Sequence, residues 1–364
     1  MNQVIVQVVQ HLRPGGIETM ALDLLTQLEP QADIHIFSLE GEKKAAINAW
    51  PRLANVADKL HFFEKPQGLD FQLTQALSHK LKQLNAETVH THHIGPMLYA
   101  GLAAKCLGIT HIHTEHDSWH LKHKSNLYLQ RALIKLLRPI LVADCPEVAE
   151  ALTRHIPSAK PKVILNGVDI HRFYPPTKQQ KLAAKKCFKL PASALIIGCA
   201  ARLELVKGHS VLFKALSKAH PDIHLVLAGD GSLKHHLEDL AEKMGLQNRI
   251  TFLGNLNDIV PFYHAIDLFC LPSLNEGFPL SPLEAQACGV PAIVSDVGGC
   301  KNTVCPDTGT AVPPGEVAPL QEAILRFYEK SQPGNPRLFV LGTGSLERTA
   351  LSYFQLMKPS GGLA

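Results

Sequence analysis

One segment in the second half of the chain specifies a complete strand–loop–helix–strand unit. It begins with an apolar run at residues 266–271 and ends with another at 290–295. Between them, Ser281 suits the N-cap of a helix, Pro282 its first position, and Gly289 the position just past its end. Strands joined through a helix run parallel, and parallel sheets bind ligands beyond the carboxyl ends of their strands. The loop that precedes the helix is therefore predicted to lie at a binding edge.

Two carboxylates, Glu276 and Glu284, belong to this unit. Ser281 and Glu284 have the S-x-x-E spacing of a capping box, which stabilises a helix N-terminus and needs no ligand. Glu276 has no obvious structural role of this kind, because it lies in a loop rich in glycine and proline at the end of a strand. Glu276 is therefore the stronger candidate for contact with a ligand.

Strand-like and helix-like runs alternate along the whole chain, which is the pattern of α/β proteins built on parallel sheets. A chain of 364 residues is long for one hydrophobic core and sufficient for two. Pro175-Pro176 and the polar, lysine-rich stretch after them indicate a linker. We predict two Rossmann-like, doubly wound parallel-sheet domains, 1–172 and 173–340, followed by a C-terminal helix and tail at 341–364. The strand-like runs are 4–9, 33–38, 87–90, 111–114, 140–143 and 162–165 in the first half, and 194–200, 224–228, 249–253 and 266–271 in the second.

Composition argues against several other classes of protein. No apolar run reaches the roughly 18 residues that a membrane span requires, and the N-terminus lacks the basic region and cleavage site of a signal peptide. The eight cysteines include no CxxC pair, and the twenty histidines show no zinc-ligand spacing. The net charge of +4 is modest. We expect a cytoplasmic protein with reduced cysteines, no bound metal and no nucleic-acid partner.

Residues that suit phosphate binding follow strand-like runs in both halves. Gly15 and Gly16 come after the first run, where glycine lets a backbone approach a ligand closely, although a simple turn would also explain them. They do not form a GxGxxG motif, which disfavours a dehydrogenase. Arg202 and Lys207 follow the first run of the second half and suit a pyrophosphate. Two solvent-exposed charges are the alternative interpretation.

A histidine also lies at this edge of the first sheet. His116 follows the run 111–114 and is a candidate ligand-binding residue, with His113 as the alternative. The simpler interpretation of any one of the twenty histidines is a packed or solvent-exposed side chain.

These strings together resemble the retaining glycosyltransferases of GT-B fold in the large family 4 group. The string E-G-F-P-L-S-P-L-E-A-Q-A-C-G-V-P places Glu276 and Glu284 as in the E-x7-E signature of that family. The string G-G-I-E at 15–18 resembles its G-G-x-E loop, and N-G-V-D at 166–169 resembles its domain join. The string at 202–207 resembles its R-x4-K diphosphate clamp. The resemblance covers nearly the whole chain.

The resemblance implies an activity and a role for each candidate residue. The activity is transfer of a sugar from a nucleotide-diphosphate sugar to an acceptor hydroxyl with retention of configuration, by same-face attack and without cofactor or metal. The two domains would face a central cleft, and the last helix would cross back to the first domain. Glu276 would contact the donor sugar, Glu284 the ribose, and His116 the sugar from the acceptor-binding domain. The residues that would complete the donor site are Gly16, Arg202, Lys207, Gly277, Phe278 and Leu280.

The chain departs from the family pattern at two places. Ala201 stands where relatives often have glycine, which bears on the path of that loop. After Gly298-Gly299 the chain continues Cys300-Lys-Asn302, where relatives usually continue toward Pro-Glu, and this bears on donor or acceptor choice. Two other functions stay open at this point. They are a nucleotide-sugar epimerase or hydrolase on the same fold, and a non-catalytic nucleotide-sugar-binding scaffold.

Residues 121–138 predict a basic amphipathic helix without any acid. Such a helix can cover a sheet with a solvated charged face, or it can rest on an anionic bilayer. In related enzymes the N-terminal domain meets membrane-borne acceptors, so we expect a glycan or lipid-linked acceptor and peripheral contact with the inner face of the plasma membrane. Its cations are Lys122, Lys124, Arg131, Lys135 and Arg138. Its apolar residues that could face the protein core or a bilayer are Leu129, Leu133, Leu136 and Leu137.

Overall fold

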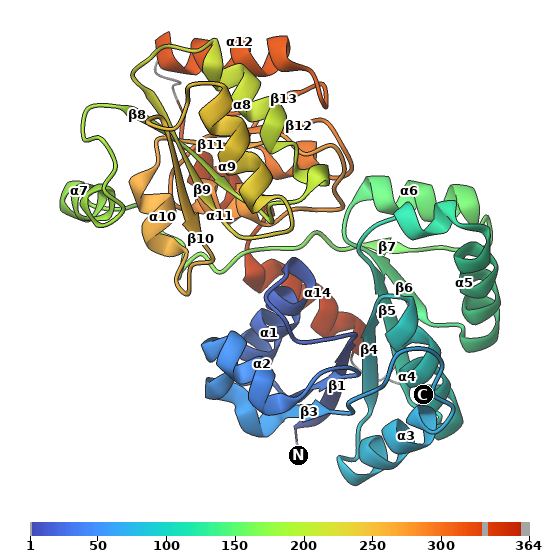
Figure 1. Ribbon diagram of the computed structural model, residues 1–364. Coiled ribbons are helices and arrows are strands. Elements are labelled where there is room, and N and C mark those ends of the chain that lie inside the picture. The colour runs from blue at the N-terminus through green and yellow to red at the C-terminus, as the bar shows by residue number, and fades with distance from the viewer. Residues whose placement is uncertain (1, 330–333, 358–364) are drawn as a thin grey trace. The chain divides into compact units, whose positions relative to one another are not determined.

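The computed structural model describes residues 2–329 and 334–357, which form two compact units (Figure 1). The first contains the residues up to Asn166 together with those from Leu346 onward, and the second extends from Gly167 to Ser345. The sequence pattern placed the two boundaries near residues 172 and 340. The tail expected after Met357 lies outside the described residues. No helix within the described ranges is long and apolar enough to cross a membrane.

Parallel strands form the sheet of the first unit, in the order β3-β2-β1-β4-β5-β6-β7. The chain starts in the middle at β1, moves outward to β3, and then returns to build the other half from β4 to β7. This order defines a doubly wound sheet whose topological switch point lies between β1 and β4. The strands are β1 (Gln3–Val9), β2 (Ala32–Ser38), β3 (Leu60–Phe62), β4 (Thr88–His92), β5 (Thr110–Glu115), β6 (Ile140–Ala143) and β7 (Lys162–Val163).

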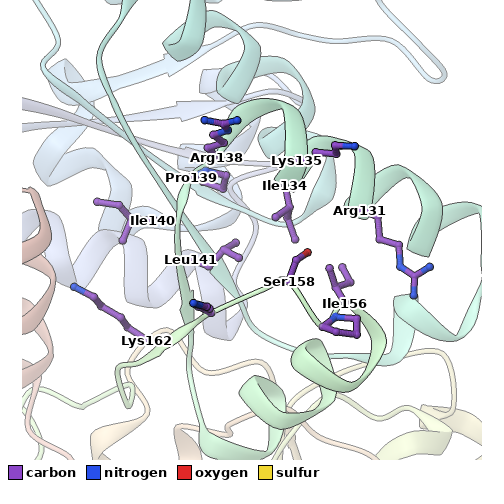
Figure 2. A pocket seen from close by; sticks show the side chains of 12 residues that line it. Arg131, Ile134, Lys135, Arg138, Pro139, Ile140, Leu141, Ile156, Ser158 and Lys162 are labelled. Carbon is purple, nitrogen blue, oxygen red and sulfur yellow. The ribbon is translucent and has the colours of Figure 1, made fainter.

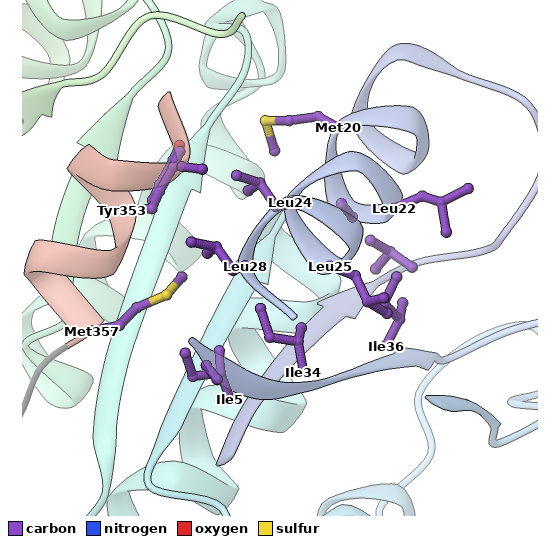
Figure 3. Packing of buried hydrophobic residues seen from close by; sticks show 14 of the residues in the cluster. Ile5, Met20, Leu22, Leu24, Leu25, Leu28, Ile34, Ile36, Tyr353 and Met357 are labelled. Carbon is purple, nitrogen blue, oxygen red and sulfur yellow. The ribbon is translucent and has the colours of Figure 1, made fainter. Parts of the chain in front are cut away.

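Helices cover both faces of this sheet, because its central strands are buried on both sides. On one face, Leu24 and Leu28 of α1 lie over Ile5 of β1 (Figure 3). Tyr353 and Met357 of α14 belong to the same cluster, so the last described helix packs on the first unit. The other face is covered by α3 and α4. The helical segments are α1 (Gly16–Leu28), α2 (Lys43–Ala49), η1 (Pro51–Lys59), α3 (Leu73–Gln83), α4 (Ile94–Leu107), η2 (Trp119–Lys122), α5 (Lys124–Leu137), α6 (Pro146–His155) and α14 (Leu346–Met357).

The second unit repeats this architecture with the strand order β10-β9-β8-β11-β12-β13, again all parallel. Its switch point lies between β8 and β11. The strands are β8 (Leu195–Ala200), β9 (Ile223–Ala228), β10 (Ile250–Gly254), β11 (Leu268–Leu271), β12 (Ala292–Ser295) and β13 (Thr310–Val312). The helical segments are α7 (Lys178–Cys187), η3 (Leu205–Lys207), α8 (His209–Ser217), α9 (Lys234–Lys243), α10 (Val260–Ala265), α11 (Ser281–Ala287), η4 (Cys300–Thr303), α12 (Val317–Glu329) and α13 (Pro336–Thr343).

The predicted α/β class with two doubly wound parallel sheets is confirmed. One local prediction is wrong: Ser281 is not the N-cap of its helix. Helix α11 already includes Ser281, and Leu280 takes the N-cap position without a side-chain capping hydrogen bond. Gly289 does adopt the left-handed conformation expected just past the helix, with φ of +81°. The capping-box interpretation of Ser281 and Glu284 therefore fails, because Ser281 lies one residue too far along the chain.

Candidate active site

In the second unit, two loops meet at the carboxyl edge of the sheet, one after β8 and one after β11. The N–H of Leu274 donates to the carbonyl of Val206 at 2.7 Å and joins the loops. Gly208 has a φ of +68°, and a Cβ there would lie 2.0 Å from the carbonyl oxygen of Pro272. Only glycine allows this close approach. The two switch-point strands thus bring their loops together, as the position of the switch predicts.

This contact brings Lys207 and Glu276 together. The Nζ of Lys207 lies 2.5 Å from Oε1 of Glu276, and Oγ of Ser273 donates to the same oxygen at 2.7 Å. Glu276 is 7% exposed and Lys207 is 16% exposed, so the ion pair is largely shielded from solvent. Oε2 of Glu276 has no partner among the described residues, which leaves one carboxylate oxygen to accept hydrogen bonds from a ligand.

The loop of Glu276 is held from its other side by the glycine pair after β12. The N–H of Gly299 donates to the carbonyl of Gly277 at 2.6 Å. Gly298 has a φ of +52°, and a Cβ there would lie 2.0 Å from the carbonyl oxygen of Glu276. Phe278, the next residue of the loop, is buried. The loop is therefore packed between backbones on both sides and holds the Glu276 carboxylate in one place.

Glu284 lies in the first turn of α11, and its Oε2 accepts a hydrogen bond from the hydroxyl of Tyr263 at 2.5 Å. Tyr263 is fully buried on α10. Burial, together with the nearby charge of Glu284, raises the pKa of Tyr263 well above its ordinary value. The phenol therefore keeps its proton and acts as a donor that orients Glu284.

The remaining donor-site candidates of this unit differ in exposure. Arg202 is exposed on the loop that also carries Lys207, and it forms no ion pair within the described ranges. Its guanidinium is therefore available to an anionic ligand. Leu280 is half-buried at the start of α11. Sequence reasoning did not single out Ser273 or Tyr263. The three-residue spacing from Ser273 to Glu276 was a usable sign, whereas Tyr263 lies in an apolar run that shows none.

In the first unit, His116 follows the carboxyl end of β5 and is buried between two side chains. Its Nδ1 lies 3.4 Å from Oδ2 of Asp144, and its Nε2 lies 3.0 Å from Nδ1 of His92. Burial raises the pKa of the Asp144 carboxyl and lowers that of His92 well below its ordinary value. Both ring nitrogens of His116 are thus occupied within this unit, which fixes the plane of the ring.

The alternative candidate, His113, lies inside the sheet rather than at its edge. It is fully buried, with Nδ1 at 2.9 Å from Oγ1 of Thr91 and Nε2 at 3.5 Å from Oε2 of Glu115. These contacts describe a packed strand residue. The structure therefore places His116, and not His113, at the carboxyl edge of the sheet, where ligands of such sheets bind.

The structure adds His93, which the sequence analysis does not single out. His93 directly follows β4 with a φ of +70°, which is unusual for a residue with a side chain. Its ring lies 6.3 Å from that of His116, and its buried Nδ1 has no hydrogen-bond partner among the described residues. Burial lowers its pKa to about 4, so the ring is neutral at pH 7. Strained residues of this kind at a strand end often belong to functional sites.

The glycine pair after β1 begins α1, with Gly15 as N-cap and Gly16 as the first helical residue. A Cβ on Gly15 would lie 2.3 Å from Oε2 of Glu18, whereas a Cβ on Gly16 would meet nothing within 4 Å. The packing of the unit therefore does not require glycine at residue 16, and the space beside it is open. Across residues 2–329 and 334–357, there is no group of three or more His, Cys, Asp and Glu side chains that could hold a metal ion.

Both halves of the chain match models of known protein families. Residues 14–172 match the model described as Glycosyltransferase Family 4, and residues 181–337 match the model described as Glycosyl transferases group 1. The chain belongs to the family 4 glycosyltransferases of GT-B fold. Gly16 and His116 lie in the first matched region of this family 4 chain, and the residues from Arg202 to Glu284 lie in the second.

Some curated relatives of this family 4 chain are named for the biosynthesis of lipopolysaccharide core or O-antigen. It is 33% identical over 202 residues to the lipopolysaccharide core biosynthesis mannosyltransferase LpsB of Rhizobium meliloti, a match to 52% of this chain and 56% of LpsB. It is 28% identical over 306 residues to the putative glycosyltransferase EpsF of Bacillus subtilis, covering 80% of this chain and 79% of EpsF. The chain spans about half the length of LpsB and of a Corynebacterium glutamicum mannosyltransferase that it also matches.

Solved structures agree with the fold over nearly the whole chain. The crystal structure of Anabaena HepE in complex with UDP superposes with a TM-score of 0.84 at 20% identity, and it covers 97% of this chain and 98% of HepE. A glycosyltransferase from Rickettsia africae gives a TM-score of 0.83 at 23% identity, covering 98% of each chain. At these identities the likeness establishes the GT-B fold of this family 4 chain.

Proposed function

We propose that the chain transfers a sugar from a nucleotide-diphosphate sugar to a hydroxyl of a glycan or lipid-linked acceptor, in polysaccharide or glycolipid synthesis. The observation that carries this proposal is the shielded contact of Lys207 and Ser273 with one oxygen of Glu276. It places a fixed cation and a half-free carboxylate side by side at the switch point of the second sheet. That combination suits a sugar attached to a phosphate.

The chemistry assigns separate roles to the two charges. When the bond between the sugar and the diphosphate breaks, negative charge builds up on the departing phosphate oxygens. A cation that is already in place stabilises this charge without reorganisation at the moment of reaction, and Lys207 is held in place by Glu276. Arg202, exposed on the same loop, adds a second cation for the diphosphate. These side chains supply the positive charge themselves, so we propose a reaction that needs no metal.

The carboxylates bind the neutral parts of the donor. Oε2 of Glu276 accepts hydrogen bonds from sugar hydroxyls, because Oε1 is already occupied. Glu284, oriented by Tyr263, accepts from the ribose. We propose that His116 also contacts the donor sugar, which requires one of its ring nitrogens to leave Asp144 or His92. We propose retention of configuration by same-face attack, in which the leaving phosphate accepts the proton of the acceptor hydroxyl.

The donor is inferred to be a nucleoside diphosphate hexose. One curated relative is named as a GDP-mannose-dependent mannosyltransferase, and the HepE structures include complexes with UDP and with UDP-glucose. When the acceptor is lipid-linked, we propose that the enzyme acts at the cytoplasmic side of a membrane. The basic helix α5 supports this part of the proposal.

A panel of nucleotide sugars tests this function directly. A donor that binds only the native state raises the melting temperature, by an amount that grows with ligand concentration over Kd. GDP-mannose, UDP-glucose, GDP and UDP would be compared, and the bound donor would then be incubated with candidate acceptors. Transfer that leaves the anomeric configuration unchanged, as monitored by NMR, supports the proposal. Donor turnover that never requires an acceptor would instead identify a hydrolase or an epimerase, and binding without turnover would identify a scaffold.

A further inference from the structure

Three buried side chains form a row along the carboxyl edge of the first sheet. His92 is the last residue of β4, His116 follows β5, and Asp144 follows β6. These strands are neighbours in the order β4-β5-β6, so the row crosses three adjacent strands. None of the three side chains is more than 7% exposed. The hydrogen bonds of His116 are therefore set by its two neighbours in the row rather than by solvent.

The row lies at the edge where parallel sheets bind ligands. Figure 2 shows the opposite, amino edge of the same sheet, where Ile140 and Lys162 begin β6 and β7 and line a pocket of about 770 Å³. That pocket is separate from the row. Within the row, His92 lies toward the switch point between β1 and β4, and Asp144 lies away from it. The ring nitrogen of His116 that meets His92 thus faces the side on which a doubly wound sheet binds its ligand.

The position of one proton in this row follows from Gln7 of β1. Nε2 of Gln7 donates to the carbonyl of Ala21 at 2.7 Å, so the Oε1 end of the amide faces Nε2 of His92 at 3.4 Å. An amide oxygen accepts hydrogen bonds, so Nε2 of His92 carries a proton. Burial lowers the pKa of His92 well below its ordinary value, so the ring is neutral and holds only this proton. Nδ1 of His92 is therefore bare and can only accept.

His116 must supply the proton between the two rings. Its Nε2 lies 3.0 Å from the bare Nδ1 of His92, and a hydrogen bond of this length requires one proton between the two nitrogens. That proton belongs to Nε2 of His116, which donates. The other nitrogen of the ring, Nδ1, faces Oδ2 of Asp144 at 3.4 Å. His116 therefore carries an N–H that can serve a sugar hydroxyl, and in this structure His92 accepts it.

The two contacts of His116 differ in what their loss would leave behind. Release of His92 would leave one neutral ring nitrogen without a partner, a condition that the fold already tolerates at the buried Nδ1 of His90. Release of Asp144 would leave a buried carboxyl group. Its Oδ1 already lacks a hydrogen-bond partner within the described ranges, and Asn166 reaches its Oδ2 only at 3.5 Å. Because a buried ionisable group is the costlier one to leave unpaired, His116 is expected to keep Asp144 and to release His92.

We propose that His92 holds the place of a donor-sugar hydroxyl. It accepts the Nε2–H of His116 until the sugar replaces it, while Asp144 stays in contact and anchors the ring. His92 and Asp144 are positioning residues, because they act through His116. This inference rests on the proposed function, and specifically on contact between His116 and the donor sugar. It predicts that loss of the two partners has different effects on sugar binding.

The test compares two pairs of probes by titration calorimetry, UDP-glucose with UDP and GDP-mannose with GDP. The ratio of the affinities within a pair isolates the contribution of the sugar. Asp144→Ala removes the anchor and should lower this ratio about fivefold, the effect of one lost hydrogen bond. Asp144→Asn should restore most of the ratio, because an amide can donate to Nδ1 of His116 or accept from it. UDP and GDP alone should bind all these variants as they bind the wild type.

Loss of the other partner should act differently. His92→Phe keeps an aromatic ring but removes the acceptor, so the sugar no longer competes with His92 for the N–H of His116. The affinity ratio should therefore stay at the wild-type value or rise. The matched control is Thr88→Val, which removes a buried hydroxyl at the amino end of the same strand and should leave the ratio unchanged. Circular dichroism and melting temperatures show whether each variant folds.

NMR of the wild type with isotope-labelled histidine tests the proton positions without any substitution at the site, with signals assigned by comparison with His116→Gln. Nε2 should be protonated in both His92 and His116, and Nδ1 of His92 should be bare. On addition of a sugar nucleotide that binds, Nδ1 of His92 should lose its hydrogen bond whereas the proton on Nε2 of His116 should stay. A proton on Nδ1 of His92 in the free protein would overturn the proposal, even if His92→Phe does not fold.

The binding outcomes separate this inference from the proposed function. Equal losses in Asp144→Ala and His92→Phe would show that both partners only hold the ring, and would overturn the placeholder role of His92. An unchanged ratio in Asp144→Ala would overturn the anchoring role of Asp144. In both cases the probes still bind the wild type, so the proposed function would stand. A wild type that binds none of the four probes would contradict the proposed function, and this inference would fall with it.

Discussion

The Nζ of Lys207 lies 2.5 Å from Oε1 of Glu276, although 69 residues separate them in the chain. Two loops from neighbouring strands, β8 and β11, bring the charges together, and Ser273 completes the contact from the Glu276 side. The carboxylate keeps the ammonium in position before any ligand arrives. A preorganised cation of this kind is what stabilisation of a departing diphosphate requires.

The first prediction follows from that role. Lys207→Ala should lower turnover by roughly 100- to 1,000-fold, the scale seen when one preorganised charge-stabilising donor is removed. Turnover is measured as release of the nucleoside diphosphate. The exposed Lys214→Ala variant on α8 serves as the control. Circular dichroism checks the fold, because removing one partner of a shielded ion pair also destabilises a protein. A folded Lys207→Ala variant with near wild-type turnover would contradict the assignment.

The second prediction concerns Tyr263, which we propose to influence donor binding through Glu284, the residue to which its hydroxyl donates. Tyr263→Phe removes only the hydroxyl that donates to Glu284. A hydrogen bond to a charged group contributes about 1.5 kcal/mol or more, so we expect KM for the donor to rise about tenfold with little change in kcat. Tyr353→Phe is the matched control, since it removes a buried hydroxyl that bonds Thr114 in the first unit. Equal effects of the two substitutions would show that Tyr263 is only structural.

The third prediction concerns metal ions. In the proposed reaction, Arg202 and Lys207 provide the positive charge that magnesium provides in many phosphate-transfer sites. Transfer activity should therefore persist in excess EDTA. Loss of activity on chelation, with recovery when magnesium is added back, would show that the phosphate chemistry is assigned to the wrong groups.

The fourth prediction concerns pH and His120, which lies in η2 after β5. Burial opposes its charge, but the hydrogen bond to Asp117, the charge of Glu115 and the hydrogen bond to Gln130 outweigh burial and raise its pKa to about 9. A raised pKa in the folded state stabilises the protein fully below the unfolded value of about 6.5, and this contribution is lost as the pH rises toward 9.

The melting temperature of the wild type should therefore exceed that of His120→Gln by a margin that shrinks between pH 6.5 and pH 9. The comparison is made at each pH in the same buffer, so that general alkaline destabilisation cancels between the two proteins. A constant margin across this range would mean that His120 is not held as a cation by Glu115 and Asp117.

Much of the architecture follows from local pattern. Alternating strand and helix runs specify parallel sheets, because a strand that is followed by a helix can rejoin the sheet only in the same direction. This connectivity sends every loop after a strand to the same edge. Gly16, His116, Arg202 and Glu276 could thus be placed at carboxyl edges from their positions after apolar runs. The family signature then predicts which of those residues bear on the chemistry.

The ends of a helix and the face that it buries could be determined only from the folded chain. Ser281 looked like a helix cap, but α11 begins one residue earlier than that pattern implies, since caps depend on local φ and ψ that a residue type only favours. In α5, Leu133 and Leu137 are buried whereas Leu129 and Leu136 are exposed, and spacing alone did not show which side of the helix meets the sheet.

The same limit applies to the residues that orient the site. Ser273 reaches Glu276 from three residues away, so local sequence contained that contact in principle. Tyr263 reaches Glu284, and His92 and Asp144 reach His116, only because separate elements pack side by side. Residue types along a chain indicate which face is buried and which edge is open. Which donor meets which acceptor depends on how those elements pack, because a hydrogen bond requires atoms to lie within about 3 Å of each other.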